Sequence, residues 1–222
     1  MKVDLRHFDA VIFDMDGVLI DSEPLWKIAM EEVFHSIGSN LTKQDFQKTV
    51  GLRLDEVVNF WHHHEGWEGI TPKEIEGRIV LKMRELIQEN ATPLKGVIEF
   101  LQYLKKQNIK VGLATSSYRV LIDAVLLGLE INHFFDITHS AENEMYGKPH
   151  PAVYLTVAEQ LNVQPAKCLV IEDSLNGIIS AKAAKMKVIC IPEKTHFPEP
   201  KLILADYHFE DMLLLMEALK SR

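Results

Sequence analysis

Apolar residues along this chain follow two different rhythms. Between Glu23 and about Glu89 they recur with the 3.6-residue period of amphipathic helices, and no convincing strand interrupts them. From Thr92 onward, short continuous apolar runs alternate with further helical stretches, and one such run, at 11–13, comes before both regions. The pattern therefore predicts an all-helical insert that follows the first strand of an α/β domain.

The insert is expected to hold three helices, because its apolar positions form three groups at helical spacing. Breaks at 38–40 and 66–72 separate the groups, and Thr71 and Pro72 with Glu74 nearby resemble a helix start. The positions that suit a helix are Leu25, Ile28, Ala29, Glu32 and Val33, then Leu54, Val57, Val58 and Trp61, and last Ile75, Ile79, Met83, Leu86 and Ile87.

The remainder of the chain predicts a Rossmann-like, doubly wound parallel sheet with helices on both faces. Crossovers in such a sheet are right-handed, and ligands bind at the carboxyl ends of the strands. A surface loop is expected at 192–200. The predicted helices are 97–106, 120–127, 151–161, 177–185 and 211–220, and the predicted strands after the first are 109–114, 135–139, 168–171 and 188–191.

Composition narrows the classes of function. The 222 residues are 47% hydrophobic and 25% charged, a balance typical of a globular domain. The formal net charge is −8 and the isoelectric point is near 5.7, which argues against nucleic-acid binding by phosphate neutralisation. A small phosphorylated molecule remains compatible with this charge, because a local lysine, backbone N–H groups and a metal ion set the field of such a site.

The two cysteines and the N-terminus bear on the compartment. Cys168 and Cys190 lie in apolar runs that we interpret as core strands, so we expect small buried hydrophobes, with a disulfide as the alternative if the two strands are neighbours. The N-terminal residues lack a long apolar region, and neither a signal peptide nor a membrane span is expected. These features favour a cytoplasmic protein, and we expect a monomer.

Acidic residues stand directly after the first apolar run. Asp14 and Asp16 follow Val11–Phe13, and Gly17 allows a tight turn away from the strand. Two carboxylates so close together in a partly dry cleft repel each other, whereas a divalent cation with oxygen ligands lets both stay ionised. The segment therefore predicts a cation site at the end of the first strand.

The later strand ends carry complementary groups. Hydroxyls at 115–117 follow the second strand and could hold an anion together with backbone N–H groups. Lys148 stands before a proline-started helix, and Glu172 and Asp173 follow the strand at 168–171. Acid pairs, hydroxyls and one lysine at the same edge of a sheet are suited to phosphoryl chemistry, in which charge develops on phosphate oxygens.

Taken together, these segments resemble the four motifs of the haloacid dehalogenase-like hydrolases in order and spacing, over essentially the whole chain. A single Asp-x-Asp-Gly is weak evidence, since acids and glycine also form ordinary turns; the ordered set of four is specific. The motif segments are Phe-Asp-Met-Asp-Gly at 13–17, Leu-Ala-Thr-Ser at 113–116, Lys-Pro at 148–149 and Ile-Glu-Asp-Ser-Leu-Asn-Gly at 171–177.

The helical insert resembles the cap of the phosphoglucomutase-like phosphatases in this superfamily. The stretches 21–26, 51–61 and 148–154 look like those of bacterial 2-deoxyglucose-6-phosphate and hexitol phosphatases. The resemblance implies a core domain of residues 1–17 and 90–222, and a cap of residues 18–89 that selects the substrate. It implies a Mg²⁺-dependent phosphatase of small phosphomonoesters, such as sugar or sugar-alcohol phosphates, in which Mn²⁺ could replace Mg²⁺.

The mechanism that the resemblance implies is nucleophilic catalysis through an aspartyl-phosphate. Asp14 would be the nucleophile and a metal ligand. Asp16 would donate a proton to the leaving alcohol and then activate water, while its backbone carbonyl binds the metal. Asp173 would be the third protein ligand, and Glu172 would bind through a metal-held water.

The resemblance also assigns the phosphate contacts. Thr115 and the N–H of Ser116 would hold phosphoryl oxygens, and Lys148 would bridge the phosphate and the nucleophile. Ser117 is left open between a helix N-cap and a substrate contact. Arg53 is either a surface cation or a residue that reaches the substrate across the cleft, and we favour the second. The hinges of a closing cap are expected near residues 17 and 89.

Other polar and aromatic side chains are interpreted as ordinary structure. The histidines at 62–64 point about 100° apart on a helix and cannot converge on one ion, so we interpret them as surface residues. Trp26, Trp61 and Trp67 could line the cap above the substrate; for Trp26 and Trp61 we favour packing.

Two rivals to a phosphatase remain. A phosphosugar mutase would use the same aspartyl-phosphate, but mutases resembling this chain carry a histidine in the helix after the first strand and a Lys-Asn pair after the second-strand motif. In this chain the first of those places is occupied by Leu25 and Trp26, and the second by Tyr118 and Arg119. Both differences favour hydrolysis. A binding protein with a vestigial site would lack a motif residue, and none is missing. A kinase phosphate-binding loop is absent from the sequence.

Overall fold

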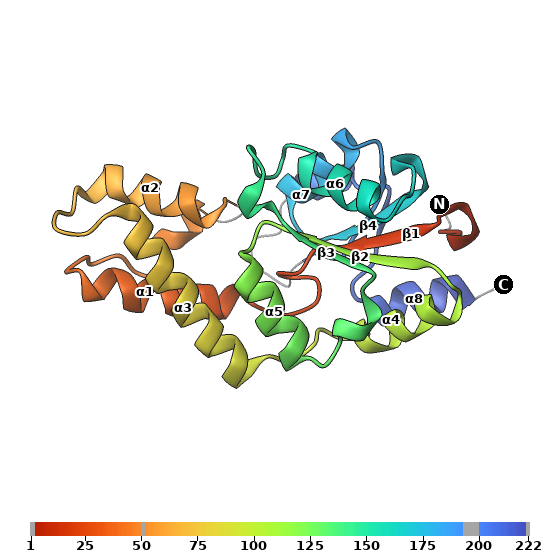
Figure 1. Cartoon of the computed structure of the whole chain (residues 1–222), viewed down its shortest axis with the longest axis horizontal. Coiled ribbons are helices and arrows are strands. Elements are labelled where there is room, and N and C mark those ends of the chain that lie inside the picture. The colour runs from red at the N-terminus through yellow and green to blue at the C-terminus, as the bar shows by residue number, and fades with distance from the viewer. Residues whose placement is uncertain (1–2, 50–51, 193–199, 221–222) are drawn as a thin grey trace.

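A parallel sheet covered by helices on both faces and a separate layer of three helices make up most of the computed structural model, which describes residues 3–49, 52–192 and 200–220 (Figure 1). The strands are β1 (Ala10–Phe13), β2 (Lys110–Thr115), β3 (Ile137–Ser140), β4 (Cys168–Glu172), β5 (Lys187–Cys190) and β6 (Tyr207–His208). The helices are α1 (Glu23–Ser36), α2 (Leu54–Glu65), α3 (Pro72–Asn90), α4 (Val97–Lys106), α5 (Arg119–Gly128), α6 (Ala152–Gln160), α7 (Leu175–Ala183) and α8 (Met212–Lys220).

The sheet is parallel throughout, with the strand order β3-β2-β1-β4-β5-β6. Phe13 of β1 pairs with Leu113 of β2 on one side and Ile171 of β4 on the other. The order of the strands reverses between β1 and β4, and ligands of doubly wound sheets bind outside the carboxyl ends of the strands at such a point. The expected fold class is confirmed, and its site-forming edge lies where β1, β2 and β4 end.

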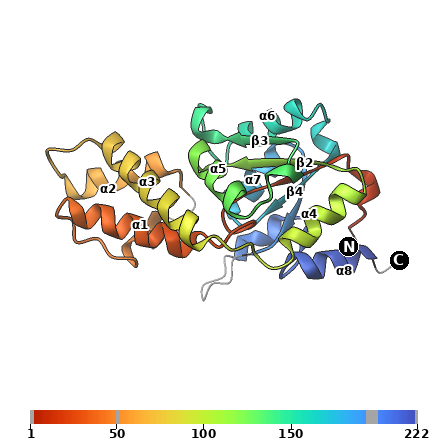
Figure 2. The same ribbon diagram turned by 60° about the horizontal axis from the view of Figure 1, so that its bottom comes forward.

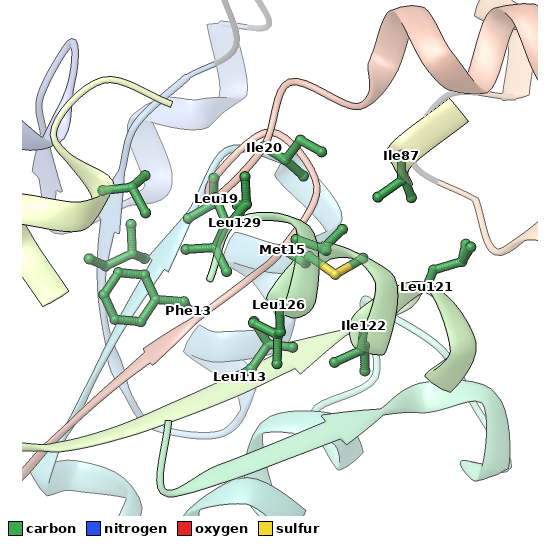
Figure 3. Close-up of a cluster of buried hydrophobic side chains, with 14 of the residues drawn as sticks. Phe13, Met15, Leu19, Ile20, Ile87, Leu113, Leu121, Ile122, Leu126 and Leu129 are labelled. Carbon is green, nitrogen blue, oxygen red and sulfur yellow. The ribbon is translucent and has the colours of Figure 1, made fainter. Parts of the chain in front are cut away.

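Alternate residues of the central strands pack on opposite faces of the sheet, because successive side chains of a strand point in opposite directions. Val11 and Phe13 belong to a cluster with α4, α5 and α8, whereas Ala10 and Ile12 belong to a cluster with α6 and α7. Figure 3 shows part of the first cluster, which reaches from β1 to Ile87 at the end of α3. Its labelled members are Phe13, Met15, Leu19, Ile20, Ile87, Leu113, Leu121, Ile122, Leu126 and Leu129.

Helices α1, α2 and α3 form a layer of their own beyond the carboxyl ends of the strands, and both chain ends lie at the opposite end of the molecule (Figure 2). This agrees with the three helices expected in the insert. The layer meets the sheet domain where α3 packs against α5. Among the described residues, no helix combines the length and the apolar character that a membrane crossing requires.

Two neighbouring segments connect this layer to the sheet domain, residues 14–22 and 91–96. The N–H of Leu94 donates to the carbonyl of Leu19 at 3.0 Å, and Ile20 forms an isolated antiparallel bridge with Pro93. Both chain crossings therefore lie side by side at the same edge of the sheet.

Several details differ from the sequence expectation. The two-residue strand β6 was not expected, because a pair of extended residues leaves no hydrophobic period to detect. Helix α7 begins at Leu175, two residues before the expected start, with the Ser174 hydroxyl accepting from the N–H of Gly177 at its N-terminus. Gly51 and most of the expected loop at 192–200 lie outside the described residues.

The cysteines are free and buried, as expected. Strands β4 and β5 are neighbours, but Glu172 is the residue of β4 that pairs with Cys190, so Cys168 lies at the opposite end of β4. The disulfide alternative is therefore wrong. Burial raises the pKa of each thiol to about 12, which keeps both in the unreactive protonated form.

Candidate active site

A cleft of about 190 Å³ lies between the carboxyl ends of the strands and the three-helix layer. Its sheet side is polar and its helical side is mostly apolar. The sheet side includes Asp14, Asp16, Thr115, Ser116, Ser117, Lys148, Asp173, Ser174 and Asn176. The helical side includes Trp26, Met30, Phe46, Leu52, Arg53, Leu54 and Val57. All the predicted site residues line this cleft except Glu172, which lies behind it, fully buried.

The turn after β1 is specific to glycine. Gly17 has φ of +70°, and a Cβ atom there would overlap Oδ2 of Asp173. Before the turn, the N–H of Asp14 donates to the carbonyl of Ile171 at 3.0 Å, so β1 remains attached to β4 up to its first acid. The absence of a side chain at residue 17 thus lets the first and fourth strand ends bring their carboxylates together.

Lys148 joins the two acidic strand ends. Its Nζ lies 2.8 Å from Oδ1 of Asp14 and 2.7 Å from Oε1 of Glu172, and it also donates to the carbonyl of Ala114 at 3.2 Å. Its side chain is only 6% exposed. A buried ammonium requires such partners, since an unpaired charge would be strongly destabilising. Lys148 is therefore a component of the site and not a solvated lysine that happens to precede a helix.

Glu172 is saturated with hydrogen bonds. Oε1 accepts from Lys148 and from the hydroxyl of Tyr154 at 2.7 Å. Oε2 accepts from the N–H groups of Asp173 and Ser174, both at 3.1 Å, and from the Ser174 hydroxyl at 2.9 Å. Burial alone would raise the pKa of Glu172, but Lys148 and these donors outweigh it and hold the pKa below the ordinary value. Glu172 is thus a fixed negative charge.

Asp14, Glu172 and Asp173 form an acidic cluster in which one carboxylate oxygen of each lies within 4.8 Å of the others. Burial raises the pKa of Asp14 to about 7; Lys148 opposes this shift, and the charges of Glu172 and Asp16 add to it. Burial, followed by Glu172 and Asp14, raises the pKa of Asp173 well above its ordinary value. One lysine does not balance three carboxylates, and hard oxygen ligands of this kind suit a divalent cation. The cluster could hold such an ion.

Asp16 is held by three donors. Oδ1 accepts from the Ser22 hydroxyl at 2.5 Å and from the indole Nε1 of Trp26 at 3.1 Å. Oδ2 accepts from the Ser117 hydroxyl at 2.6 Å. The donors come from the start of α1 and from the loop after β2, so this carboxylate connects the helical layer to the sheet.

The hydroxyls after β2 divide into two roles. Thr115, 1% exposed, accepts the N–H of Ser117 at 3.1 Å through Oγ1, which leaves its own O–H to donate elsewhere. Ser117 does not cap α5, because the N-cap position is Tyr118 and the Ser117 hydroxyl is bonded to Asp16. The N-cap interpretation of Ser117 is therefore wrong. Ser116 lines the cleft between them.

Arg53 spans the gap between the helical layer and the sheet domain. Its guanidinium forms a two-pronged contact with Asp55, at 2.9 and 2.6 Å, and Nη1 donates to the carbonyls of Ala141 and Glu144 at 3.4 and 3.3 Å. The side chain is 18% exposed and lines the cleft. It is not a free surface cation, and it lies where it could meet a ligand.

The aromatic and histidine expectations have mixed outcomes. Trp61 is 1% exposed and packs in the helical layer, as expected. Trp26 also packs there, but in addition it lines the cleft and binds Asp16. His63 and His64 are exposed and His62 is half-buried against Trp67; among the described residues, the only potential metal-binding group of three acids or histidines is the cluster above.

Ser22, Tyr154 and the indole N–H of Trp26 are contacts that the sequence reasoning missed. The four-residue spacing of Ser22 and Trp26 could have placed them on one helix face beside Asp16. Tyr154 has no such local signal, because its partner Glu172 lies 18 residues away on another element.

Comparison with known proteins agrees with this geometry. A family model described as haloacid dehalogenase-like hydrolase matches residues 11–191. Hexitol phosphatase B of Escherichia coli (strain K12) is 40% identical over 202 residues, which cover 90% of this chain and 91% of the relative. A phosphorylated carbohydrates phosphatase of Thermotoga maritima is 35% identical over 188 residues, 82% of this chain and 83% of the relative.

The solved structure of CbbY from Rhodobacter sphaeroides in complex with phosphate shares the fold, with a TM-score of 0.86 at 21% identity over 96% of this chain and 99% of that one. The family model spans all four strand-end motifs, from β1 to the end of β5. The chain therefore belongs to the haloacid dehalogenase-like hydrolases.

Proposed function

We propose that this hydrolase is a phosphatase that cleaves the phosphate monoester of a small sugar or sugar alcohol through an aspartyl-phosphate on Asp14. The observation that carries the proposal is the buried Asp14 carboxylate at the floor of the cleft, 2.8 Å from Lys148. The relatives named as hexitol and carbohydrate phosphatases, which match most of this chain, support the substrate class.

In the first step an oxygen of the Asp14 carboxylate attacks phosphorus, and the bond between phosphorus and the leaving oxygen breaks. Asp16 gives its proton to that leaving oxygen, so the alcohol departs neutral. In the second step water attacks the aspartyl-phosphate, Asp16 accepts the water's proton, and inorganic phosphate leaves Asp14 free again. Lys148 offsets the negative charge that accumulates between the nucleophile and the phosphoryl group.

Thr115 and Ser116 are proposed to hold the phosphoryl oxygens. The Thr115 hydroxyl has an O–H available as a donor, because its contact with the N–H of Ser117 uses only the oxygen lone pair. Arg53 is proposed to bind the substrate from the helical side, and its place in the lining of the cleft supports this role. For Ser117 we propose a role through Asp16, to which its hydroxyl is bonded.

The donor set fits Mg²⁺, with Mn²⁺ as a substitute, because every candidate ligand is an oxygen and the cluster carries uncompensated negative charge. We propose that Asp14, Asp173 and the backbone carbonyl of Asp16 would hold it. Glu172 would bind through a water, which is supported by the five donors that already occupy its oxygens. When bound, the ion would supply positive charge that keeps the carboxylates ionised and reduces repulsion of the phosphate.

We further propose that residues 18–89 form a cap that selects the substrate, over a core of residues 1–17 and 90–222. The adjacent connections at 14–22 and 91–96 support hinges there, near residues 17 and 89. We propose a cytoplasmic monomer without a nucleic-acid partner, which the net charge of −8 and the two free cysteines support.

The test is phosphate release from a panel of hexitol and hexose phosphates with Mg²⁺, comparing the wild type with Asp14→Asn. The isosteric amide keeps the hydrogen-bonding shape but is a poor nucleophile, so we expect activity to fall by about 10⁴-fold or more. Asp123→Asn, in an exposed ion pair with Arg119, is the matched control and should keep full activity. Equal activity of Asp14→Asn and wild type would refute the mechanism, and conversion of β-glucose 1-phosphate to glucose 6-phosphate without phosphate release would favour a mutase.

A further inference from the structure

The first turn of α1 presents two donors to one oxygen of Asp16. Ser22 and Trp26 are four residues apart, and the N–H of Trp26 donates to the carbonyl of Ser22 at 2.9 Å, which closes the first helical turn. Residues at this spacing lie on the same face of a helix. As a result, both the Ser22 hydroxyl and the Trp26 indole reach Oδ1 of Asp16.

Ser22 makes this contact instead of a more common one. It occupies the N-cap position of α1, where serine usually accepts a backbone N–H, yet it forms no side-chain cap hydrogen bond. Such a cap is worth about 1 kcal/mol. The helix therefore forgoes a local stabilising contact, and the hydroxyl points to Asp16. A local departure from the usual pattern of this kind is typical of functional sites.

Trp26 differs from the other tryptophans of the helical layer. The indole N–H groups of Trp61 and Trp67 are buried and have no hydrogen-bond partner among the described residues, so these two rings contribute through packing in the helical layer. Trp26, in contrast, donates to a carboxylate and also lines the cleft. One side chain of the cap thus touches both the proton-carrying group and the space available to the leaving alcohol.

The chemistry of the donors distinguishes the two oxygens of Asp16. An indole N–H can only donate, whereas a serine hydroxyl can turn and accept. Oδ1, which faces Trp26, therefore always presents a lone pair to the indole. Oδ2 is held from the other side by the Ser117 hydroxyl. The indole consequently helps to fix the orientation of the carboxyl plane, which sets the direction in which Asp16 can deliver a proton.

We propose that Trp26 is a positioning residue for Asp16. Proton delivery to the leaving alcohol then depends on the position of the cap relative to the core. This inference rests on the proposed function, in which Asp16 is the proton donor. It gives Trp26 a role beyond packing. When the cap is displaced, the first turn of α1 moves with it, and Asp16 loses a donor that sets its direction.

The kinetic test compares leaving groups. Trp26→Phe keeps an aromatic wall but removes the N–H. The readout is kcat/KM, which covers the steps up to departure of the leaving group and excludes the later attack of water, in which Asp16 serves both substrates alike. With a hexitol phosphate, whose alcohol leaves only with a proton, we expect kcat/KM to fall about 10- to 100-fold, a part of the full contribution of a general acid. With 4-nitrophenyl phosphate, whose phenolate leaves unprotonated, we expect kcat/KM to change by no more than about twofold.

Trp67→Phe is the matched control, since it makes the same substitution at another half-buried cap tryptophan whose indole N–H has no hydrogen-bond partner among the described residues. It should leave both kcat/KM values unchanged. An equal fall of kcat/KM for both substrates with Trp26→Phe, an unchanged kcat/KM for both, or an increase for the hexitol phosphate would overturn the inference. Loss of both activities in Asp14→Asn tests the proposed function separately.

A spectroscopic test addresses the contact without relying on catalysis. The chain has three tryptophans and hence three indole N–H signals in a ¹⁵N spectrum, of which Trp26→Phe identifies one. We expect Asp16→Ala to shift the Trp26 signal while those of Trp61 and Trp67 stay in place. An unshifted Trp26 signal would overturn the inference even if the protein proved to be an active phosphatase.

Discussion

The two sides of the cleft are built on opposite principles. On the sheet side, charged and polar groups bond to one another: Lys148 joins Asp14 to Glu172, and Asp16 accepts three hydrogen bonds. On the side of the helical layer, the lining is mostly apolar, with side chains such as Met30, Phe46 and Val57. The sheet side holds the groups proposed to perform chemistry on any phosphate monoester, whereas the apolar wall opposite can only favour one shape over another.

This difference has a physical reason. Buried charges must be paired and hydrogen-bonded, so each group on the sheet side is constrained by several others and a change at one disturbs the rest. An apolar wall has no such mutual constraint, because dispersion contacts and hydrophobic burial are non-directional. Discrimination by an apolar wall is modest, about 1–3 kcal/mol per methylene. In the proposed division into core and cap, the chemistry is thus fixed and the selection of the substrate is adjustable.

Among the substitutions that compare the two sides of the cleft, the largest effect is expected from Gly17→Ala, which alters the constrained sheet side. A Cβ at Gly17 would overlap Oδ2 of Asp173, and φ of +70° adds backbone strain of about 1 kcal/mol. Asp173 would have to move out of the acidic cluster, so we expect kcat/KM to fall by about 10²-fold. Steady-state kinetics at several Mg²⁺ concentrations, together with the melting temperature, measure this.

Gly38→Ala separates the effect of backbone strain from the effect of the clash with Asp173. Gly38 has φ of +84°, and a Cβ atom at this position would have no neighbouring atom within 4 Å, so alanine there has the same backbone strain without the clash. It should lower the melting temperature only by the part that is due to backbone strain and leave kcat/KM within about twofold. If the two variants lose activity equally, the close approach of Gly17 to Asp173 has no functional meaning.

Much of the sheet side could be predicted from the sequence, since the rule that ligands bind at strand ends is geometric. The apolar runs located five of the six strands, and the polar residues after them include Asp14, Thr115 and Asp173. Strand β6 was not predicted, because two residues are too few to show an alternation of apolar and polar positions. The helix boundaries were reproduced to within about two residues, as the expected 97–106 and the observed α4 illustrate.

The remaining contacts were not predictable because they depend on which side chains face each other across the folded chain. The Ser117 hydroxyl donates to Asp16 over a separation of 101 residues, and the Tyr118 hydroxyl donates to the buried Glu76 of α3 at 2.8 Å. Periodicity assigns a residue to a face of its own helix but not to a partner on another element. For Trp26 it correctly indicated packing and gave no sign of the polar contact.

A smaller effect is expected from Leu52→Ala, which alters the apolar wall on the side of the helical layer. Leu52 lines the cleft and is 42% exposed, so its truncation removes apolar contact without opening a core cavity. We expect KM for a hexitol phosphate to rise about 3- to 10-fold, with kcat within about twofold. Leu81→Ala, on the exposed surface of α3, is the control and should change neither constant. A fall of kcat without a change of KM would mean that this apolar wall participates in the chemistry.

The smallest effect on activity is expected from Asp211→Asn, which alters the core beneath the connection at 91–96. Asp211 accepts from Lys95 at 2.6 Å and from the N–H of Leu214 at 2.9 Å. Lys95, followed by that N–H, lowers the pKa of Asp211 below its usual value. A lowered carboxyl pKa stabilises the fold above the unfolded-state pKa of about 4, and this stabilisation is lost as the pH falls through the folded-state pKa.

Urea unfolding should therefore show that Asp211→Asn lowers the free energy of unfolding by about 1 kcal/mol at pH 7, and that the difference shrinks as the pH falls below about 4. Because Asp211 touches no residue of the cleft lining through these contacts, kcat and KM should stay at wild-type values. A change in kcat would mean that the contacts of Asp211 beneath residues 91–96 affect the position of the proposed cap. The mutual constraint seen on the sheet side of the cleft would then extend to the proposed hinge.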